Sequence, residues 1–132
     1  MRPSLKFVLA LTAAATLATA AMAQQRLFFG VATGGTGGTY YPLGGMLAQL
    51  MSNKAIVDGK KISATAEAAG ASVGNAQLLG KKEIESAFVA ADILDAAYNG
   101  TGQFDKAPLK SLRALGALYP ETVQLITRAD MN

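Results

Sequence analysis

The sequence predicts an α/β fold, with a mostly parallel sheet and helices on both faces. Stretches with strand-like patterns alternate with stretches of helical periodicity, and this alternation is typical of β-α-β units. The first strand candidate is apolar almost throughout, as expected of a parallel strand that is buried on both sides. A glycine-rich loop then joins this strand to a helix. The expected order of elements is β-α-β-α-β-α-β-β.

The first strand is predicted over residues 27–32, and the glycine-rich loop over residues 33–41. Pro42 follows the loop, where a helix can begin because proline is tolerated in the first turn. Apolar residues then recur with helical spacing, and we expect this stripe and its methionines to pack in the core. The stripe consists of Leu43, Met46, Leu47, Leu50 and Met51.

The remaining elements are predicted from alternation, turn residues and capping residues. Ser72 is a plausible N-cap for a helix that runs through residue 81, and Asp92 for one that runs through residue 98. Residues 53–59 are expected to form a polar turn. The strands are expected at residues 61–67, 84–91, 112–119 and 122–127.

The N-terminus has the pattern of a secretory signal peptide. Arg2 and Lys6 precede an uncharged run over residues 7–20, and Ala21-Met22-Ala23 offers small residues before a cut at Gln24. A transmembrane anchor is the alternative, but the run is too short and too rich in Ala and Thr for a span of about 20 apolar residues. We therefore expect residues 1–23 to be a cleaved signal peptide and residues 24–132 to be exported.

Composition excludes several classes of function. The net charge of +3 falls to +1 without Arg2 and Lys6, and no basic stripe with interleaved aromatic residues indicates nucleic acid binding. The chain has no Cys and no His. It therefore lacks the usual zinc and copper ligands and the commonest general base. We expect neither an enzyme nor a cofactor.

Ligands of open α/β sheets bind at the carboxyl ends of the strands, which here lie in residues 34–41, 68–75, 90–92 and 119–121. The glycines of the first loop would permit positive φ and close approach to a ligand, and the helix N-terminus after it favours carboxylate or phosphate. Nucleotide fingerprints fail, because Tyr40 stands where Gly or Ala is needed and no Gly-Lys-Ser/Thr follows. A tight turn that only packs helix on strand is the alternative.

Polar side chains at the other places each have a structural alternative. Ser72 and Asn75 could point into one crevice or cap a helix, and Asp92 could accept from an ammonium group or cap its own helix. The tyrosines near these ends could line a pocket or pack in the core. Glu121 is expected to be a solvated carboxylate.

Five segments, in order and spacing, resemble the TAXI proteins, the solute receptors of one branch of the TRAP transporters. They cover nearly all of the chain after the predicted signal peptide. The first is the loop with the sequence GGTGGTYYPLGG, and the last two contain YNGTG and LYPE. The segments are residues 34–45, 67–75, 88–92, 97–102 and 118–123.

This resemblance implies a periplasmic binding protein with two α/β lobes that close on a ligand, of which this chain is the first lobe and the second is missing. It implies a small carboxylate ligand (glutamate, glutamine, a 2-oxoacid or a dicarboxylate), transport through integral-membrane TRAP subunits, and no cofactor. Some relatives are called immunogenic proteins. A ligand-sensing periplasmic module and a binding protein of another transporter class are the alternatives. As a fragment, residues 1–132 alone are expected to bind weakly or not at all.

The resemblance also implies the ligand contacts. They are Gly37, Gly38, Thr39, Tyr40, Ser72, Asn75, Asp92 and Tyr119. Two positions depart from the family pattern: Ala90 stands where Gln is frequent, and Gly74 where an acidic residue is frequent.

Overall fold

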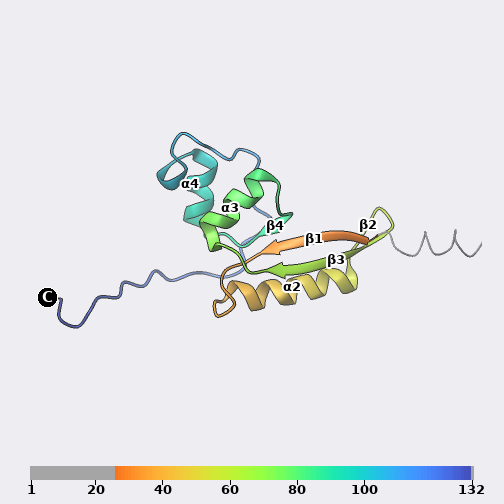
Figure 1. Ribbon diagram of the computed structural model, residues 1–132, viewed down its shortest axis with the longest axis horizontal. Helices are drawn as coiled ribbons and strands as arrows, with labels where there is room; N and C mark the ends of the chain where they lie inside the picture. Colours follow the sequence, from red (N-terminus) through yellow and green to blue (C-terminus); the bar gives the residue numbers. More distant parts are fainter. Residues whose placement is uncertain (1–25, 132) are drawn as a thin grey trace, which may run out of the picture.

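The computed structural model describes residues 26–131, so the predicted signal peptide lies outside the described residues. Figure 1 shows a small sheet with α2 along one side and α3 and α4 on the other. The elements are β1 (Arg26–Ala32), α2 (Tyr40–Lys54), β2 (Ile56–Val57), β3 (Lys60–Glu67), α3 (Ala71–Lys81), β4 (Ser86–Ala87), α4 (Ala91–Asn99) and the 3-10 helix η1 (Gly102–Phe104).

The sheet has four strands in the order β2-β3-β1-β4. The central strand β1 pairs in parallel with β3, from Arg26 opposite Lys61 to Ala32 opposite Glu67. It also pairs in parallel with the short strand β4, whereas β2 pairs with β3 in the antiparallel sense. The predicted α/β class is therefore confirmed, and the architecture is consistent with one lobe of a periplasmic binding protein.

The predicted polar turn at residues 53–59 contains a short hairpin. Val57 pairs with Lys60, and only Asp58 and Gly59 connect the two strands. Both connecting residues have positive φ, 50° and 73°. This is the geometry of a two-residue turn whose twist matches that of the strands, and an Asp-Gly pair favours it.

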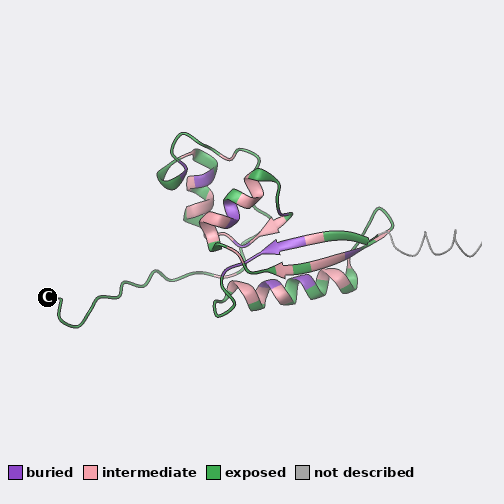
Figure 2. Ribbon diagram, viewed as in Figure 1, coloured by how far each residue is buried: buried purple, intermediate pink, exposed green. Residues whose placement is uncertain are grey.

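The predicted strands after residue 111 are wrong. Residues 112–119 and 122–127 form no strand, and the C-terminal part of this segment runs away from the rest of the structure as an exposed trace (Figures 1 and 2). Apolar and β-branched residues predict strand conformation, but a strand also needs a neighbour to accept its backbone hydrogen bonds. The described part of the chain supplies none. The strand predicted over residues 84–91 shortens to Ser86–Ala87 for a similar reason, since only these two residues pair with β1.

The predicted helix caps are also wrong. Gly70 precedes α3 and Ala90 precedes α4, and neither helix has a side-chain hydrogen bond at its N-cap. Ser72 and Asp92 each stand one residue inside their helix instead. Ser72 has another partner, because its oxygen accepts a hydrogen bond from the Ala90 N–H at 2.9 Å. Its hydroxyl therefore joins the start of α3 to the start of α4.

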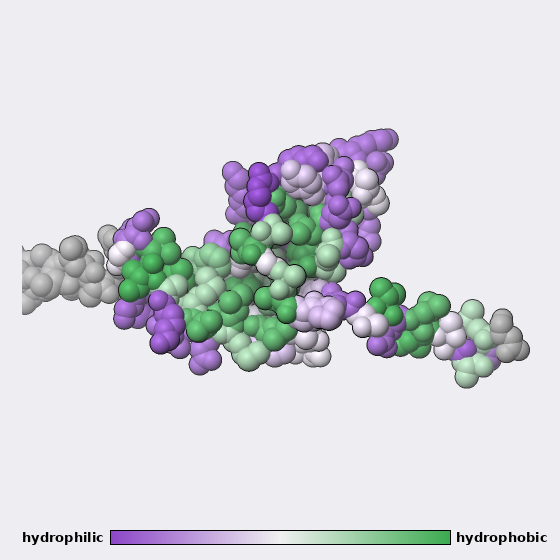
Figure 3. All heavy atoms as spheres, turned by 180° about the vertical axis from the view of Figure 1, so that it is seen from behind, coloured by the Kyte–Doolittle hydropathy of each residue, from purple (hydrophilic) through white to green (hydrophobic). Residues whose placement is uncertain are grey.

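The prediction that the apolar stripe of α2 lies in the core is wrong. The helix turns the small residues Gly44 and Ala48 toward the sheet, whereas Met46 is 59% exposed and Leu50 is 58% exposed. A Cβ atom on Gly44 would lie 2.5 Å from Cγ2 of Thr33, so this side of the helix approaches the sheet too closely for larger residues. The stripe faces outward, and Figure 3 shows hydrophobic side chains gathered on the side of the molecule seen from behind.

Two apolar clusters support the fold. Val31 and Ala32 of β1 and Ile62 of β3 are buried within the sheet layer. A second cluster fills the space between α3, α4, η1 and the chain that follows. Its buried members are Ala76, Ala97, Phe104 and Leu112.

Candidate ligand-binding site

The carboxyl ends of β1, β3 and β4 meet at one edge of the sheet, as predicted, because all three strands run in the same direction. Thr33, the first residue after β1, ties two of these ends together. Its N–H and its hydroxyl both donate to the Glu67 carbonyl, at 2.9 Å and 2.8 Å. The residue is fully buried. The edge is therefore held rigidly beneath the loops that follow the strands.

Asn75 fixes the same edge from α3. Its amide nitrogen donates to the carbonyls of Phe88 at 2.8 Å and Thr33 at 3.0 Å, and lies 3.4 Å from that of Ala32. The side chain is fully buried, and its Oδ1 has no hydrogen-bond partner in the structure. Asn75 was predicted to touch a ligand. In this conformation it lies beneath the site and holds the ends of β1 and β4 together.

Tyr40, the first residue of α2, stands at the centre of the polar side chains. Its hydroxyl donates to Oε2 of Glu121 at 2.9 Å, and its ring packs on Phe88 with a centroid distance of 5.3 Å. The Ser72 hydroxyl lies close enough to this phenol to lower the pKa of Tyr40. Two hydrogen bonds therefore fix the polar side chains here: the Ala90 N–H donates to Ser72, and Tyr40 donates to Glu121.

Tyr119 completes this arrangement, because its hydroxyl donates to the other carboxylate oxygen of Glu121 at 3.3 Å. Burial, followed by Glu121 and Asp92, raises the pKa of Tyr40, although the neighbouring Ser72 hydroxyl opposes this effect. Burial and the Glu121 carboxylate also raise the pKa of Tyr119. Both phenols therefore remain protonated donors at neutral pH.

The glycine-rich loop differs from its prediction in one respect. No residue in 33–41 has a positive φ, so the loop does not need glycine for that reason. The Gly38 N–H closes a turn on the Gly35 carbonyl at 2.9 Å. A Cβ atom on Gly35 or Gly37 would meet nothing within 4 Å, so the backbone there is open to solvent. Such open backbone can be approached closely by a ligand.

An apolar groove of about 560 Å³ adjoins the two phenols. The outward stripe of α2 forms one wall, and Phe88 and the segment at Leu118 form the rest. Thr39, Phe88 and Tyr119 connect the groove to the polar side chains. The lining residues are Thr39, Leu43, Met46, Leu47, Leu50, Phe88, Leu118 and Tyr119. The arrangement is an apolar surface with a few convergent hydroxyls at one end, as is usual in sites for small molecules.

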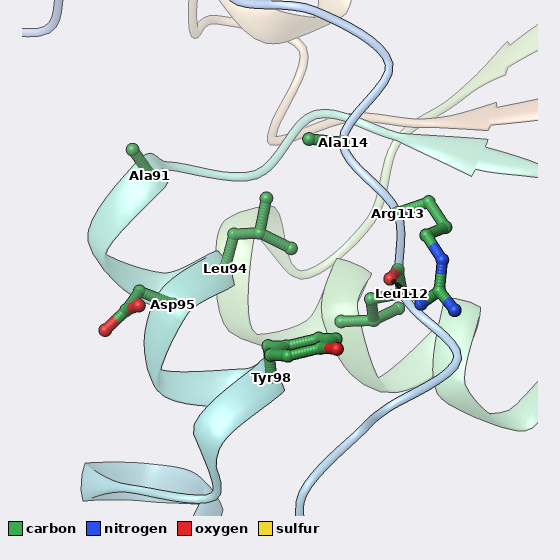
Figure 4. Close-up of a pocket in the computed structure, with 7 residues that line it drawn as sticks. All are labelled: Ala91, Leu94, Asp95, Tyr98, Leu112, Arg113 and Ala114. Atoms are coloured by element: carbon green, nitrogen blue, oxygen red, sulfur yellow. Dashed lines mark hydrogen bonds between the residues drawn. The ribbon is translucent and has the colours of Figure 1, made fainter.

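A second hollow, of about 420 Å³, lies between α4 and residues 112–114 (Figure 4). Leu94, Tyr98 and Leu112 supply most of its apolar surface, and none of the eight predicted ligand contacts lines it. The one carboxylate there, that of Asp95, accepts a hydrogen bond from Asn99 at 3.0 Å. With no convergent hydroxyls, this hollow is the weaker candidate.

Of the predicted residues, Tyr40 and Tyr119 meet on Glu121, and Ser72 and Asp92 lie near enough to Tyr40 to influence its pKa. Thr39 lines the adjoining groove, whereas Gly37 and Gly38 lie in the exposed turn before α2. Sequence reasoning missed Thr33, Phe88 and the role of Glu121. The LYPE motif that contains Glu121 marked this position as a candidate. Its contact with Tyr40 could not be predicted, because the two residues are 81 positions apart in the sequence.

Within residues 26–131, no group of three or more acidic residues is placed to hold a metal ion. No helix in this part of the chain is long and apolar enough to cross a membrane. The NMT1-like family model matches residues 31–132, which is most of the chain. This is a family of periplasmic binding-type proteins, whose role is to bind solutes rather than to catalyse reactions. The chain belongs to the NMT1-like family.

Proposed function

We propose that this protein is a periplasmic solute receptor that binds a small carboxylate, of the glutamate, glutamine, 2-oxoacid or dicarboxylate class. One observation carries the proposal. The hydroxyls of Tyr40 and Tyr119 converge at the carboxyl edge of the sheet. Both donate a hydrogen bond to the same carboxylate, that of Glu121. The site is therefore already shaped to donate two hydrogen bonds to a carboxylate.

Neighbouring groups support the same ligand chemistry. The N-terminus of α2 begins at Tyr40, so its free N–H groups and the positive end of its dipole favour an anion beside the phenols. The open backbone at Gly35 and Gly37 leaves space for close approach, and the Ser72 hydroxyl adds a further polar contact. The apolar groove along α2 would receive the carbon chain of the ligand, and Asp92 would accept from an ammonium group if the ligand carries one.

The resemblance of five segments to TAXI proteins supports the finer assignment. We propose that residues 1–23 are a cleaved signal peptide, that residues 24–132 belong to the solute-binding domain, and that the loaded receptor docks on integral-membrane TRAP subunits. Intact-mass measurement on the exported protein tests the first point. A polypeptide that begins at Gln24 supports export with cleavage, whereas one that retains Met1 contradicts it.

Calorimetric titration with glutamate, glutamine, 2-oxoglutarate and succinate tests the ligand class. Tyr40→Phe removes one donor to the carboxylate and keeps the ring on Phe88, and Tyr98→Phe is the matched control in the other hollow. A hydrogen bond to a charged group contributes about 1.5–3 kcal/mol, so Tyr40→Phe should weaken binding by roughly 10-fold to 100-fold. Equal affinity in wild type and Tyr40→Phe would contradict the proposal.

A further inference from the structure

We propose that Glu121 is a built-in substitute for the ligand carboxylate, which occupies the phenol pair until a stronger carboxylate displaces it. This inference rests on the proposed function, because it concerns the same site. It makes Glu121 a specificity-determining residue that the ligand must compete with.

The geometry of the contact supports this role. Each oxygen of the Glu121 carboxylate accepts from a different phenol, Oε2 from Tyr40 and Oε1 from Tyr119. A free carboxylate held by the same two tyrosines would use its two oxygens in the same way. The side chain therefore shows where a ligand carboxylate would sit and which atoms would hold it.

The two carboxylates cannot be held at once. A phenol hydroxyl has a single proton to donate, so a bond to a ligand requires that the bond to Glu121 be given up. Repulsion acts in the same direction, because two carboxylates placed side by side disfavour one another, and Asp92 already contributes negative charge to this region. The ligand and Glu121 are therefore alternatives for one position.

In the part of the chain that the structure describes, no strand pairing holds the segment that carries Glu121 in place. Residues 113–127 pair with no strand in the described structure, and Glu121 itself is exposed. Tethering gives a bound side chain an effective concentration in the millimolar range. A ligand that binds only through its carboxylate must be present above this effective concentration to displace Glu121. A ligand whose carbon chain also fills the α2 groove gains extra contacts and can displace Glu121 at a lower concentration. Glu121 thereby weakens the binding of simple carboxylates such as acetate.

Carbon-13 NMR of labelled tyrosine side chains, recorded over an alkaline pH range on the full chain, tests this inference with acetate as the probe. In Glu121→Ala, the pKa values of Tyr40 and Tyr119 should fall because their negative neighbour is gone. Acetate should then raise both again in a saturable way, and should need a higher concentration to affect wild type. Glu121→Gln, which keeps the shape and removes the charge, should show a smaller acetate response. Glu83→Ala, which removes an exposed carboxylate elsewhere, is the control, and the Tyr41 and Tyr98 signals are internal references.

Two results would overturn the inference: unchanged titration of Tyr40 and Tyr119 in Glu121→Ala, or an acetate response that is the same in wild type and variant. In either case carboxylate binding by the wild-type protein could still be measured, so the proposed function would stand. Acetate rescue in Glu121→Ala, combined with no binding of larger carboxylates to any variant, supports the inference and contradicts the proposed ligand class. If those larger ligands do bind, Glu121→Ala should tighten them by about tenfold, as expected when a competing state populated near 90% is removed.

Discussion

Asn75 is the residue on which the geometry of the site depends most. One amide group holds the carbonyls at the ends of β1 and β4, and the side chain is entirely shielded from solvent. A buried carbonyl without a hydrogen-bond donor costs free energy, so loss of this side chain would destabilise both strand ends. The residue that the sequence assigned to the ligand therefore positions the residues that surround it.

We predict that Asn75→Ala lowers the free energy of unfolding by about 1–3 kcal/mol, since it leaves the carbonyls of Thr33 and Phe88 without a donor. Asn75→Asp should be more harmful, because it would place a buried carboxylate against those oxygens. Urea unfolding curves measure both effects. An Asn75→Asp variant as stable as wild type would show that the amide does not make these contacts.

The two phenols lead to a prediction about alkaline pH. The pKa values of Tyr40 and Tyr119 are raised, first by burial and then by Glu121, whereas unfolded tyrosine titrates near 10. Between about pH 10 and the folded pKa values, the folded protein binds more protons than the unfolded chain, so its stability falls as pH rises. This contribution is fully present below about pH 10. In Tyr40→Phe, unfolding by urea should lose stability less steeply above that pH. Parallel curves for the two proteins would contradict the assignment.

At the scale of elements, α2 connects the fold to the site. Its small residues permit close packing on the sheet, its first residue supplies a phenol, and its outward stripe forms the groove. The close approach requires glycine at position 44, because a Cβ atom there would press on Thr33, whereas the next position is open.

Gly44→Ala and Gly45→Ala form a matched pair in this helix. The first should destabilise by about 1–3 kcal/mol, because the added methyl group must displace Thr33 or the helix. The second adds a methyl group that meets nothing within 4 Å, and alanine is the better helix former, so it should stabilise by up to about 1 kcal/mol. Thermal unfolding followed by circular dichroism distinguishes them. Equal shifts in the same direction would contradict the packing of α2.

The elements that the sequence predicted are those that local pattern determines. The apolar run of β1 and the alternation of β3 each carry their own signal, and the parallel order follows from the helices between strands. The outward orientation of the α2 stripe could not be predicted. Apolar periodicity shows that one face of the helix is apolar, but it does not show which part of the protein that face contacts. The same limit applies to Ser72, which bonds to Ala90 of another helix rather than capping its own.

At the scale of the whole molecule, residues far apart in the sequence make the site. Tyr40 comes from the first helix, Ser72 and Asp92 from the next two, and Glu121 from the exposed segment beyond them. Knowledge that ligands bind at the carboxyl ends of parallel strands was enough to predict this edge and most of its residues. It was not enough to predict that the phenols meet on a glutamate, because that contact joins two segments with no shared local pattern.

An amide chemical-shift titration with L-glutamate tests the central claim most directly. If the carboxyl edge binds small carboxylates, the saturable shifts will concentrate at Gly37–Tyr40, around Ser72 and at Asp92. The amides of Leu94, Tyr98 and Leu112, which surround the other hollow, will change little. Saturable shifts that are confined to that second hollow would contradict the assignment of the site.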